Sequence, residues 1–586
     1  MTDKLFSAKN ILFGLLHILI ASLMVFLSSY IDALADNAMP LSDSGSAFRM
    51  IGLSLLWGTL IGCSTQMLVR FWNKGLGTRL LGEAPGVRQF KLRPVALWGL
   101  SWGLIFLAWI PLFLAYFPGC CTYDTSSQLL QITANAYNDH HPLIHTLFIR
   151  FCLMIGQRIF GSGTAGIAFY TILQMLFLSC TYAFAIALVY KYLSRQCLIR
   201  KVPIRIILIL LIAGSMFFPL NWYMAISVTK DTLFTGFFLL TIVYLLYNLL
   251  TMQNTLRIRA LDIIGFFGAF GITVFRNNGK YALCVLIVLL LIHGIVQKKK
   301  LFFKLFLIHT LALVIGVFLS AMAFRITDAY QGDRREMLSM PIQQLARCMI
   351  YHGGVGLLPE DDDTMSEEDK ALINEFLTEQ AYLNYLPYIS DPVKSWANTY
   401  VPRYDTKRFI KTYLRLAVHY PADYIHAWLL TNAGFLSVTD TSHAHIYDYK
   451  GLPGHGYIQT FQGGRSILEE LDIRSVSLLP GLHALMEQWA EDNGYLKIPV
   501  LRYLFMPGVW LWLQLFWLLE NTWLRKKHLH LLSLFVLAYY GTMLLGPTVQ
   551  MRYIFPIMVI TPYLMVAAFL RPLGGQYDDY ALPFGR

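Results

Sequence analysis

The chain is poor in charged residues for its size. Asp, Glu, Lys and Arg together make up 14% of its 586 residues, whereas a soluble domain carries about 25%. Hydrophobic residues make up 56%, and they are concentrated in apolar runs of the roughly 20 residues that cross a bilayer core. This composition excludes an ordinary soluble protein and predicts an all-α polytopic membrane protein.

Cysteine pairs and several common catalytic motifs are also missing. The eight Cys residues lie mostly in apolar segments and none is spaced as CxxC, so neither a zinc ribbon nor a disulfide scaffold is predicted. Cys120 and Cys121 are adjacent, which would strain a bridge between them. No Walker A sequence, Rossmann fingerprint, HExxH or GxSxG motif is found, which argues against an ATPase, a dehydrogenase, a zinc protease or a serine hydrolase.

The formal net charge of +12 does not point to nucleic acid. The Lys and Arg residues cluster in short connectors between apolar runs, which is the pattern of cytoplasmic loops in membrane proteins. We therefore expect membrane lipids, and no nucleic acid, among the partners of the chain.

The apolar runs predict about twelve transmembrane helices. The first run follows Lys4 and Lys9 and is longer than the core of a signal peptide, so we expect it to stay uncleaved. The runs cover approximately residues 11–31, 47–69, 95–117, 164–190, 203–219, 228–250, 259–275, 279–296, 303–325, 500–519, 529–546 and 552–571.

The charges of the connectors predict how these helices are oriented. Alternation along the chain puts all the basic connectors on one side, namely 70–93, 191–205, 257–259, 297–304 and 525–530. The acidic segments 32–46 and 361–369 fall on the other side. The positive-inside rule then places both termini in the cytoplasm.

The predicted helices divide the chain into four parts. They are an N-terminal two-helix membrane segment, a transmembrane module with a first outer loop, an extracytoplasmic domain, and a C-terminal three-helix segment with a cytoplasmic tail. Their bounds are 1–94, 95–325 with the loop at 117–163, 326–499, and 500–586.

Two outer segments are too long to be simple turns. In the first, residues 143–160 are apolar but carry Arg150 and Arg158, so we expect a helix in the interface plane rather than a span. The second, 326–499, is long enough for a domain. We expect it to be mainly helical, with one helix capped by Ser366 and another over 406–419.

Polar clusters stand at the predicted outer ends of several helices, where charges at membrane depth are costly and call for a reason. The first holds Tyr123, Asp124 and Gln128. Asp124 either accepts a proton from an attacking hydroxyl or caps the helix that starts near Thr125; the local sequence leaves both open.

The second cluster holds Asp139 and His141, followed by His145. His141 and His145 are one helical turn apart, a spacing compatible with a metal, although a structural or capping role is more common. A loop with His443, His445 and His455 leaves a similar choice between a metal or sugar site and an exposed loop.

Two further clusters bring cations to the outer face. Lys230 and Asp231 form either a charged pair with a snorkelling lysine or a contact to a lipid phosphate. Arg276-Asn277 and Arg552-Tyr553 stand in very short outer connectors. Arginines on the outer side run against the charge bias of the rest of the chain. Phosphate recognition would explain them, because the guanidinium fork suits phosphate. The alternative is that they pair with acidic residues of the outer domain.

In order and sidedness, these clusters resemble the GT-C class of membrane glycosyltransferases, which includes protein O-mannosyltransferases and the aminoarabinose transferase of lipid A. The resemblance spans about 95–571, and its later motifs look like an uncharacterised bacterial branch of that class. It rests on Tyr123-Asp124, His141-Pro142-Leu143-Ile144, Lys230-Asp231, Arg276-Asn277-Asn278-Gly279, the segment 340–347 and Arg552-Tyr553.

The resemblance implies an inverting enzyme in a bacterial cell membrane. It would move a sugar from a polyprenyl-phosphate donor to an extracytoplasmic glycan, lipid or protein. Either Asp124 or Asp139 would be the catalytic base. The sugar and lipid phosphate would be bound by Tyr123, Gln128, His141, Lys230, Asp231, Arg276, Asn277, Arg552 and Tyr553.

Cofactor use stays open at this point. Many GT-C enzymes have an acidic pair directly after the corresponding helix, whereas here Asp124 is followed by Thr125. No cofactor is therefore certain, and a divalent metal is one possibility.

Three rival functions have distinct signatures. A secondary transporter or lipid flippase would show repeats and charges near the midplane. An O-antigen ligase or polymerase would depend on residues of the late outer loop, such as Arg347, His352 and His443. A non-catalytic sensor would leave Asp124 dispensable.

Overall fold

The structure is a computed structural model, and it is almost entirely helical. The residues that it describes are 8–35, 44–71, 92–121, 123–195, 201–332, 337–357, 362–398, 405–439, 461–462, 465–492, 494–499, 501–523 and 526–568.

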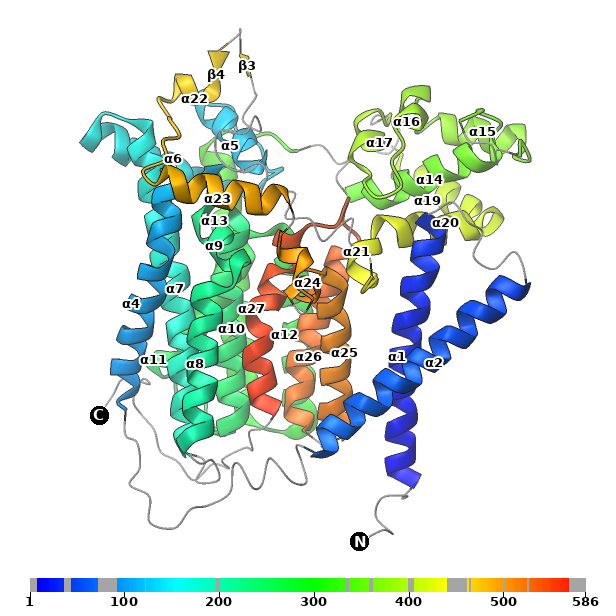
Figure 1. Ribbon diagram of the computed structural model, residues 1–586. Coiled ribbons are helices and arrows are strands. Elements are labelled where there is room, and N and C mark those ends of the chain that lie inside the picture. The colour runs from blue at the N-terminus through cyan, green and yellow to red at the C-terminus, as the bar shows by residue number, and fades with distance from the viewer. Residues whose placement is uncertain are drawn as a thin grey trace.

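A bundle of long apolar helices makes up most of the molecule (Figure 1). Its helix α10 (Lys230–Thr251) is buried along nearly its whole length and packs against α7, α11, α26 and α27. The other helices of the bundle are α4 (Pro94–Ala115), α7 (Gly163–Arg195), α8 (Lys201–Phe217), α11 (Ala260–Phe275), α12 (Asn277–Gln297), α13 (Lys300–Ile326), α25 (Pro507–Trp523), α26 (Lys527–Met543) and α27 (Met551–Ala568).

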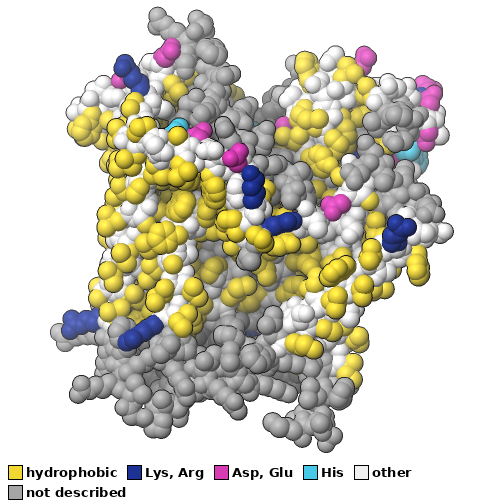
Figure 2. Space-filling view, viewed as in Figure 1, with side chains coloured by type: hydrophobic (Ala, Val, Ile, Leu, Met, Phe, Trp, Pro, Cys, Tyr) yellow, Lys and Arg dark blue, Asp and Glu magenta, His cyan; other side chains and the backbone are white. Residues whose placement is uncertain are grey.

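The first two helices stand to one side of this bundle. Helices α1 (Ala8–Ala35) and α2 (Ser44–Phe71) pack on each other, and α1 also contacts α25. In Figure 1, α1 stands to the right of α25, and α2 crosses α1 at an incline, with its lower end below α25. Hydrophobic side chains cover the middle of the visible face, and charged side chains lie above and below that band (Figure 2).

Among the described residues, eight helices are long and apolar enough to cross a membrane: α1, α2, α4, α6, α7, α10, α12 and α13. The bent pair of α8 and α9 would make a ninth span, and α11, α26 and α27 are shorter apolar helices. The prediction of an all-α polytopic membrane protein is thus confirmed. Each of the twelve predicted segments also coincides with a helix.

Short elements gather at one end of the bundle. They are β1 (Cys120–Cys121), α5 (Tyr123–Thr133), α6 (Leu143–Phe160), α9 (Pro219–Ile226) and β2 (Ser227–Val228). Strands β1 and β2 pair in parallel, with Cys120 opposite Ser227. Helix α6 begins beside α5 and ends two residues before α7, so both of its ends lie at this end of the bundle.

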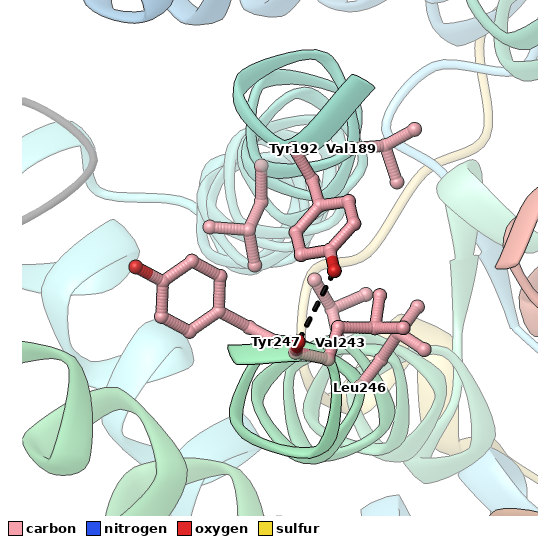
Figure 3. A pocket seen from close by; sticks show the side chains of 7 residues that line it. Val189, Tyr192, Val243, Leu246 and Tyr247 are labelled. Atoms are coloured by element: carbon pink, nitrogen blue, oxygen red, sulfur yellow. Dashed lines mark hydrogen bonds between the residues drawn. The ribbon is translucent and has the colours of Figure 1, made fainter. Parts of the chain in front are cut away.

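The basic connectors that the structure describes in full, 257–259 and 297–304, lie at the opposite end. Tyr192, near the end of α7, donates a hydrogen bond to Leu250 O near the end of α10 (3.1 Å), and Lys304 of α13 binds Asp262 at the start of α11. An apolar recess lies between α7 and α10 there, lined by Leu188, Val189, Tyr192, Val243, Leu246, Tyr247 and Leu250 (Figure 3). The lining of the recess offers no charged group.

The predicted outer domain divides into two parts. The first, which we call the outer lobe, has its own core and consists of α14 (Ser339–His352), α15 (Glu367–Asn374), α16 (Glu379–Leu383), α17 (Asp391–Ser395), α19 (Thr406–His419), α20 (Pro421–Thr431) and α21 (Ala433–Leu436). The predicted cap is confirmed, because the Ser366 hydroxyl accepts from Asp369 N (3.1 Å). The helix predicted over 406–419 is α19.

The second part returns to the bundle. It consists of β3 (Phe461–Gln462), β4 (Arg465–Ser466), α22 (Ile467–Glu470), α23 (Pro480–Glu491), the 3₁₀ helix η4 (Gly494–Lys497) and α24 (Leu501–Leu504). Strands β3 and β4 are antiparallel, α22 packs on α5, and α23 packs on α4. Segment 465–491 therefore belongs with the bundle rather than with the outer lobe.

Candidate functional site

The start of α5 and the start of α10 are held side by side by the β1–β2 pairing. Between α4 and β1 the chain turns at Gly119, which has φ +131°, and a Cβ atom there would collide with the Thr171 hydroxyl. Glycine is therefore required at this turn. The Thr125 hydroxyl donates to Val228 O. As a result Asp124, in the first turn of α5, faces Lys230, the first residue of α10.

Three basic side chains converge on the Asp124 carboxylate. Lys230 Nζ donates to Oδ2. Arg552, at the start of α27, places NH1 2.9 Å from Oδ2 and NH2 3.3 Å from Oδ1. His141 Nδ1 lies 3.9 Å from Oδ2 and 3.2 Å from Lys230 Nζ. All four side chains are largely buried, Asp124 being 13% exposed.

A second carboxylate adjoins the first. Asp231 is fully buried, and its Oδ1 accepts from Arg276 NH1 (2.5 Å). Its Oδ2 lies 3.7 Å from Arg552 Nε, so Arg552 stands between the two carboxylates. Lys230, Arg276 and Arg552 together carry three positive charges against the two negative charges of Asp124 and Asp231. We call these five residues and His141 the charge cluster.

An aromatic ring and two amides fix the arginines of the charge cluster. The guanidinium carbon of Arg276 is 4.6 Å from the centre of the Tyr553 ring, and that of Arg552 is 5.2 Å from it; contacts of this kind attract the cation to the ring face. Arg276 Nε donates to Asn278 Oδ1 and Arg552 Nε to Gln550 Oε1, each at 2.7 Å. Both guanidinium groups are therefore preorganised.

The surroundings set the protonation states of two groups in the cluster. Burial alone would raise the pKa of Asp124, but the charges of Arg552 and Lys230 outweigh it and hold that pKa well below the usual range. Burial, together with the charge of Lys230, lowers the pKa of His141. Near neutral pH, Asp124 is thus an anion and His141 is uncharged, so the cluster carries a net positive charge.

A buried hydrogen-bond chain supports the cluster from behind. Gln128 Nε2 donates to Thr146 Oγ1 (2.8 Å), and Gln128 Oε1 lies 3.0 Å from His145 Nδ1. His145 Nε2 in turn lies 2.7 Å from the Tyr170 hydroxyl. Both ring nitrogens of His145 are thus engaged away from His141, which favours the structural interpretation of this histidine. Among the described residues, no group of three or more His, Cys, Asp or Glu side chains is placed to hold a metal ion.

Sequence reasoning missed Gln174, which extends this support. Its Nε2 donates to the carbonyls of Met224, Ala225 and Ser227, at 2.7–3.2 Å. These carbonyls belong to the end of α9 and to β2, directly before Lys230. Gln174 lies inside the predicted span 164–190, where an amide is costly, and that position was the signal that could have identified it.

Several predicted site residues lie apart from the cluster. Asp139 is on the surface and accepts from Gly332 N. Asn277 is exposed, and its neighbour Asn278 makes the contact to Arg276 instead. Tyr123 opens α5, but its side chain is outside the described part of the chain. His443, His445 and His455 are likewise outside the described residues.

Arg347 and His352 belong to the outer lobe and bind there to one carboxylate. Arg347 Nε is 3.4 Å from Asp423 Oδ1, and His352 Nε2 is 2.8 Å from Asp423 Oδ2. The other ring nitrogen of His352 lies 3.0 Å from Asp362 Oδ1. These groups form a separate cluster within the lobe.

The outer lobe holds the connector that leads to Arg552. Trp428 Nε1 and Asn432 Nδ2 donate to Leu544 O at 3.1 and 3.2 Å. Ser390 N donates to Pro547 O at 2.9 Å, and Ile389 forms a β-bridge with Thr548. Because Gln550 and Arg552 follow within a few residues, the lobe helps to position the charge cluster.

Comparison with known proteins places the cluster within a family. No curated protein and no solved structure matches the chain. A family model does match, over residues 122–573, and its description is a family of unknown function, DUF6020. The match begins two residues before Asp124 and includes every member of the charge cluster and its supports. Since it covers well over half of the sequence, the chain belongs to the DUF6020 family of unknown function.

Proposed function

We propose that the protein is an inverting glycosyltransferase. It moves a sugar from a polyprenyl-phosphate donor to a glycan, lipid or protein on the outer side of a bacterial cell membrane. The observation that carries the proposal is the charge cluster, in which Asp124 and three cations meet at one end of a membrane-embedded bundle.

The cations of the cluster suit a lipid phosphate. Buried charges are costly unless they are paired, and here three cations face two carboxylates. A phosphate monoanion or dianion would bring the cluster to neutrality or near it. Arg276 and Arg552 offer planar donor forks that match phosphate geometry. Both guanidinium groups are held in place by their contact with the Tyr553 ring.

Donor binding would also convert Asp124 into a base. Without the donor, Arg552 and Lys230 keep its pKa too low to accept a proton from a hydroxyl. A phosphate that draws these two cations toward itself would remove the stabilisation of the anion and raise the pKa of Asp124. The base would thus be activated only when the donor is in place.

The reaction then follows as a single displacement. Asp124 takes the proton of the acceptor hydroxyl, whose oxygen forms a bond to the anomeric carbon of the sugar. The bond from that carbon to the phosphate oxygen breaks, and its electron pair stays on the phosphate. Arg276 and Arg552 neutralise the departing polyprenyl phosphate, the type of interaction that lowers such barriers most. Attack opposite the leaving group inverts the anomeric centre.

The remaining predicted residues take secondary roles in this proposal. His141, uncharged and 3.2 Å from Lys230, orients that lysine and the acceptor. Asp139 lies on the surface near the cluster end, where it would meet the acceptor rather than the donor phosphate. Phosphate neutralisation is assigned to Lys230, Arg276 and Arg552, so no divalent metal is required; activity that persists in a chelator would support this assignment.

The orientation in the membrane is part of the proposal. We infer twelve spans with both termini in the cytoplasm, α6 lying in the outer interface, and GT-C-like topology. Three features of the described residues support this orientation. The basic connectors 257–259 and 297–304 lie at the end opposite to Asp124, both ends of α6 lie at the Asp124 end, and helices α10, α11, α12 and α13 alternate in direction between the two ends of the bundle.

The test is a transfer assay in proteoliposomes with short-chain polyprenyl-phosphate sugars and a cell-envelope extract as acceptor. We expect a glycosylated acceptor of inverted anomeric configuration, together with free polyprenyl phosphate, both identified by mass spectrometry. A panel of donor sugars that yields no polyprenyl phosphate above the level of empty liposomes would contradict the proposal.

An O-antigen ligase-like glycan transferase is the second candidate, and a lipid flippase the third. The ligase alternative draws on the Arg347–Asp423–His352 cluster of the outer lobe. These residues bind one another rather than the Asp124 site, which is why we rank that alternative second. A ligase would lose activity on replacement of Arg347 and keep it on replacement of Asp124.

A further inference from the structure

Helix α19 carries an apolar strip on its exposed side. Ile410, Leu414 and Val418 are 49%, 56% and 78% exposed, and they recur every four residues along the helix. The strip continues onto α20, where Ile425 is 56% exposed. We call these four residues the α19–α20 strip.

The strip faces away from the core of the outer lobe. At 100° per residue, Ile410, Leu414 and Val418 lie on the side of α19 opposite to Phe409 and Leu416. The latter two are buried in the lobe core with α14 and α15. Helix α19 is therefore apolar on two opposite sides, and the described residues of the chain cover only one of them.

The contacts of α20 place the strip at the height where the membrane helices end. Tyr30, in the last turns of α1, hydrogen-bonds to His426 of α20 (2.8 Å). Ile31 and Leu34 of α1 pack in one apolar cluster with Leu429 and Leu430. Figure 1 shows α19 and α20 at the base of the outer lobe, beside the upper end of α1.

The charges beside the strip suit lipid phosphates. Lys407 and Lys411 are exposed and lie within about 60° of Leu414 around the helix. Arg408 and Arg415 lie nearer the lobe and bind Glu375 and Glu368 there. An apolar stripe edged by lysines is the pattern of a helix that lies in a bilayer interface.

We infer that α19 and the start of α20 rest on the outer lipid surface. The α19–α20 strip enters the boundary between headgroups and acyl chains, and Lys407 and Lys411 meet lipid phosphates. This contact is independent of the proposed transferase activity. It fixes the height of the outer lobe above the membrane, and through Trp428 it fixes the connector that leads to Arg552.

The experiment uses the full-length protein in nanodiscs, with its native cysteines replaced and one fluorophore attached at Leu414→Cys. Glu367→Cys is the matched control, because the Glu367 side chain is 88% exposed on α15 of the same lobe. We expect the fluorophore at 414 to be quenched by nitroxide-labelled lipids and to be several-fold less sensitive to aqueous iodide than the fluorophore at 367.

Two outcomes would overturn the inference. Equal iodide quenching at 414 and 367 would show that the strip faces water. Shielding from iodide without quenching by nitroxide lipids would show that protein covers the strip, either a second copy or another partner. Val418→Cys repeats the measurement at the most exposed residue of the strip, so the inference stays testable if Leu414→Cys fails to fold.

Discussion

Buried carboxylates stand at both ends of the bundle, and their partners differ in kind. Asp262, at the start of α11, accepts from Arg259 N three residues away (2.7 Å), from Tyr244 (2.8 Å) and from Lys304 (3.1 Å). Asp124 is bound by Lys230 and Arg552, which are 106 and 428 residues away.

The difference separates a structural carboxylate from a candidate catalytic one. Asp262 caps the start of α11 by accepting from the backbone of Arg259, which is a local contact of helix geometry. Its other two partners, Tyr244 and Lys304, lie within 42 residues of it. The charge cluster needs α5, α10, α27 and the α11–α12 junction together. It gathers more cations than helix capping requires, and an anionic ligand would neutralise the excess positive charge.

Replacing the two carboxylates gives the largest expected contrast. Asp124→Asn should lower turnover per folded molecule by at least ~100-fold, the scale of a lost general base, while donor binding is kept because the cations remain. Asp262→Asn should lower the yield and thermal stability, since it leaves Lys304 without its buried partner, and spare turnover.

Transfer assays normalised to the folded fraction, with thermal unfolding in parallel, measure this contrast. Full turnover by Asp124→Asn would show that Asp124 is not the general base. If both variants lost turnover while their stability stayed unchanged, Asp262 could not be called structural and Asp124 catalytic.

The geometry of the cations provides the next test. Arg276→Lys keeps the charge but loses the fork and the stacking on Tyr553, so the apparent KM for the donor should rise by about 10-fold or more. Arg408→Lys, a matched change in an exposed pair with Glu375, should leave KM unchanged. Equal KM values for the Arg276 variant and the unmodified protein would argue against phosphate binding at this site.

The connector held by the outer lobe should have a smaller effect. Trp428→Phe removes the hydrogen bond to Leu544 O, worth about 1 kcal/mol, and loosens the segment before Arg552. We expect a several-fold loss of activity with normal yield. Trp396→Phe, at a half-exposed position of the same lobe, is the control, and equal activities of the two variants would show that the lobe does not position Arg552.

The lobe's own ion cluster predicts the smallest effect, a dependence of stability on pH. The hydrogen bond to Asp423 raises the pKa of His352 to about 9 from its usual value of 6.5. Because the folded form binds the proton more tightly, this stabilisation is complete below pH 6.5 and is lost as pH rises through 9. The unfolding midpoint should therefore fall over this range, and fall less in His352→Gln. Parallel curves for the two proteins would contradict the assignment.

The helices could be predicted from the sequence, because a membrane span requires an uninterrupted apolar run. Small errors occurred where proline sets a helix start: the run predicted from 500 begins as α25 at Pro507, after the short α24. The extent of the outer lobe could not be predicted, since nothing local shows that segment 465–491 packs on α4 and α5.

The sequence named members of the candidate site one by one, but it did not show that they form a cluster. Charges at helix ends singled out Asp124, Lys230, Arg276 and Arg552 individually. Their contacts depend on the packing of helices hundreds of residues apart, and the same reasoning could not tell that Asp139 would lie apart. Gln174 stood out only as an amide inside a predicted span, and its contacts to backbone carbonyls follow no sequence pattern.

Native mass spectrometry with polyprenyl monophosphate tests the central claim most directly. The unmodified protein should retain the lipid, and Arg552→Gln should lose most of it. Lys300→Gln removes an exposed cation from the opposite end of the bundle and should bind as the unmodified protein does. Equal retention by all three proteins, or selective loss in Lys300→Gln, would show that the charge cluster is not a phosphate site.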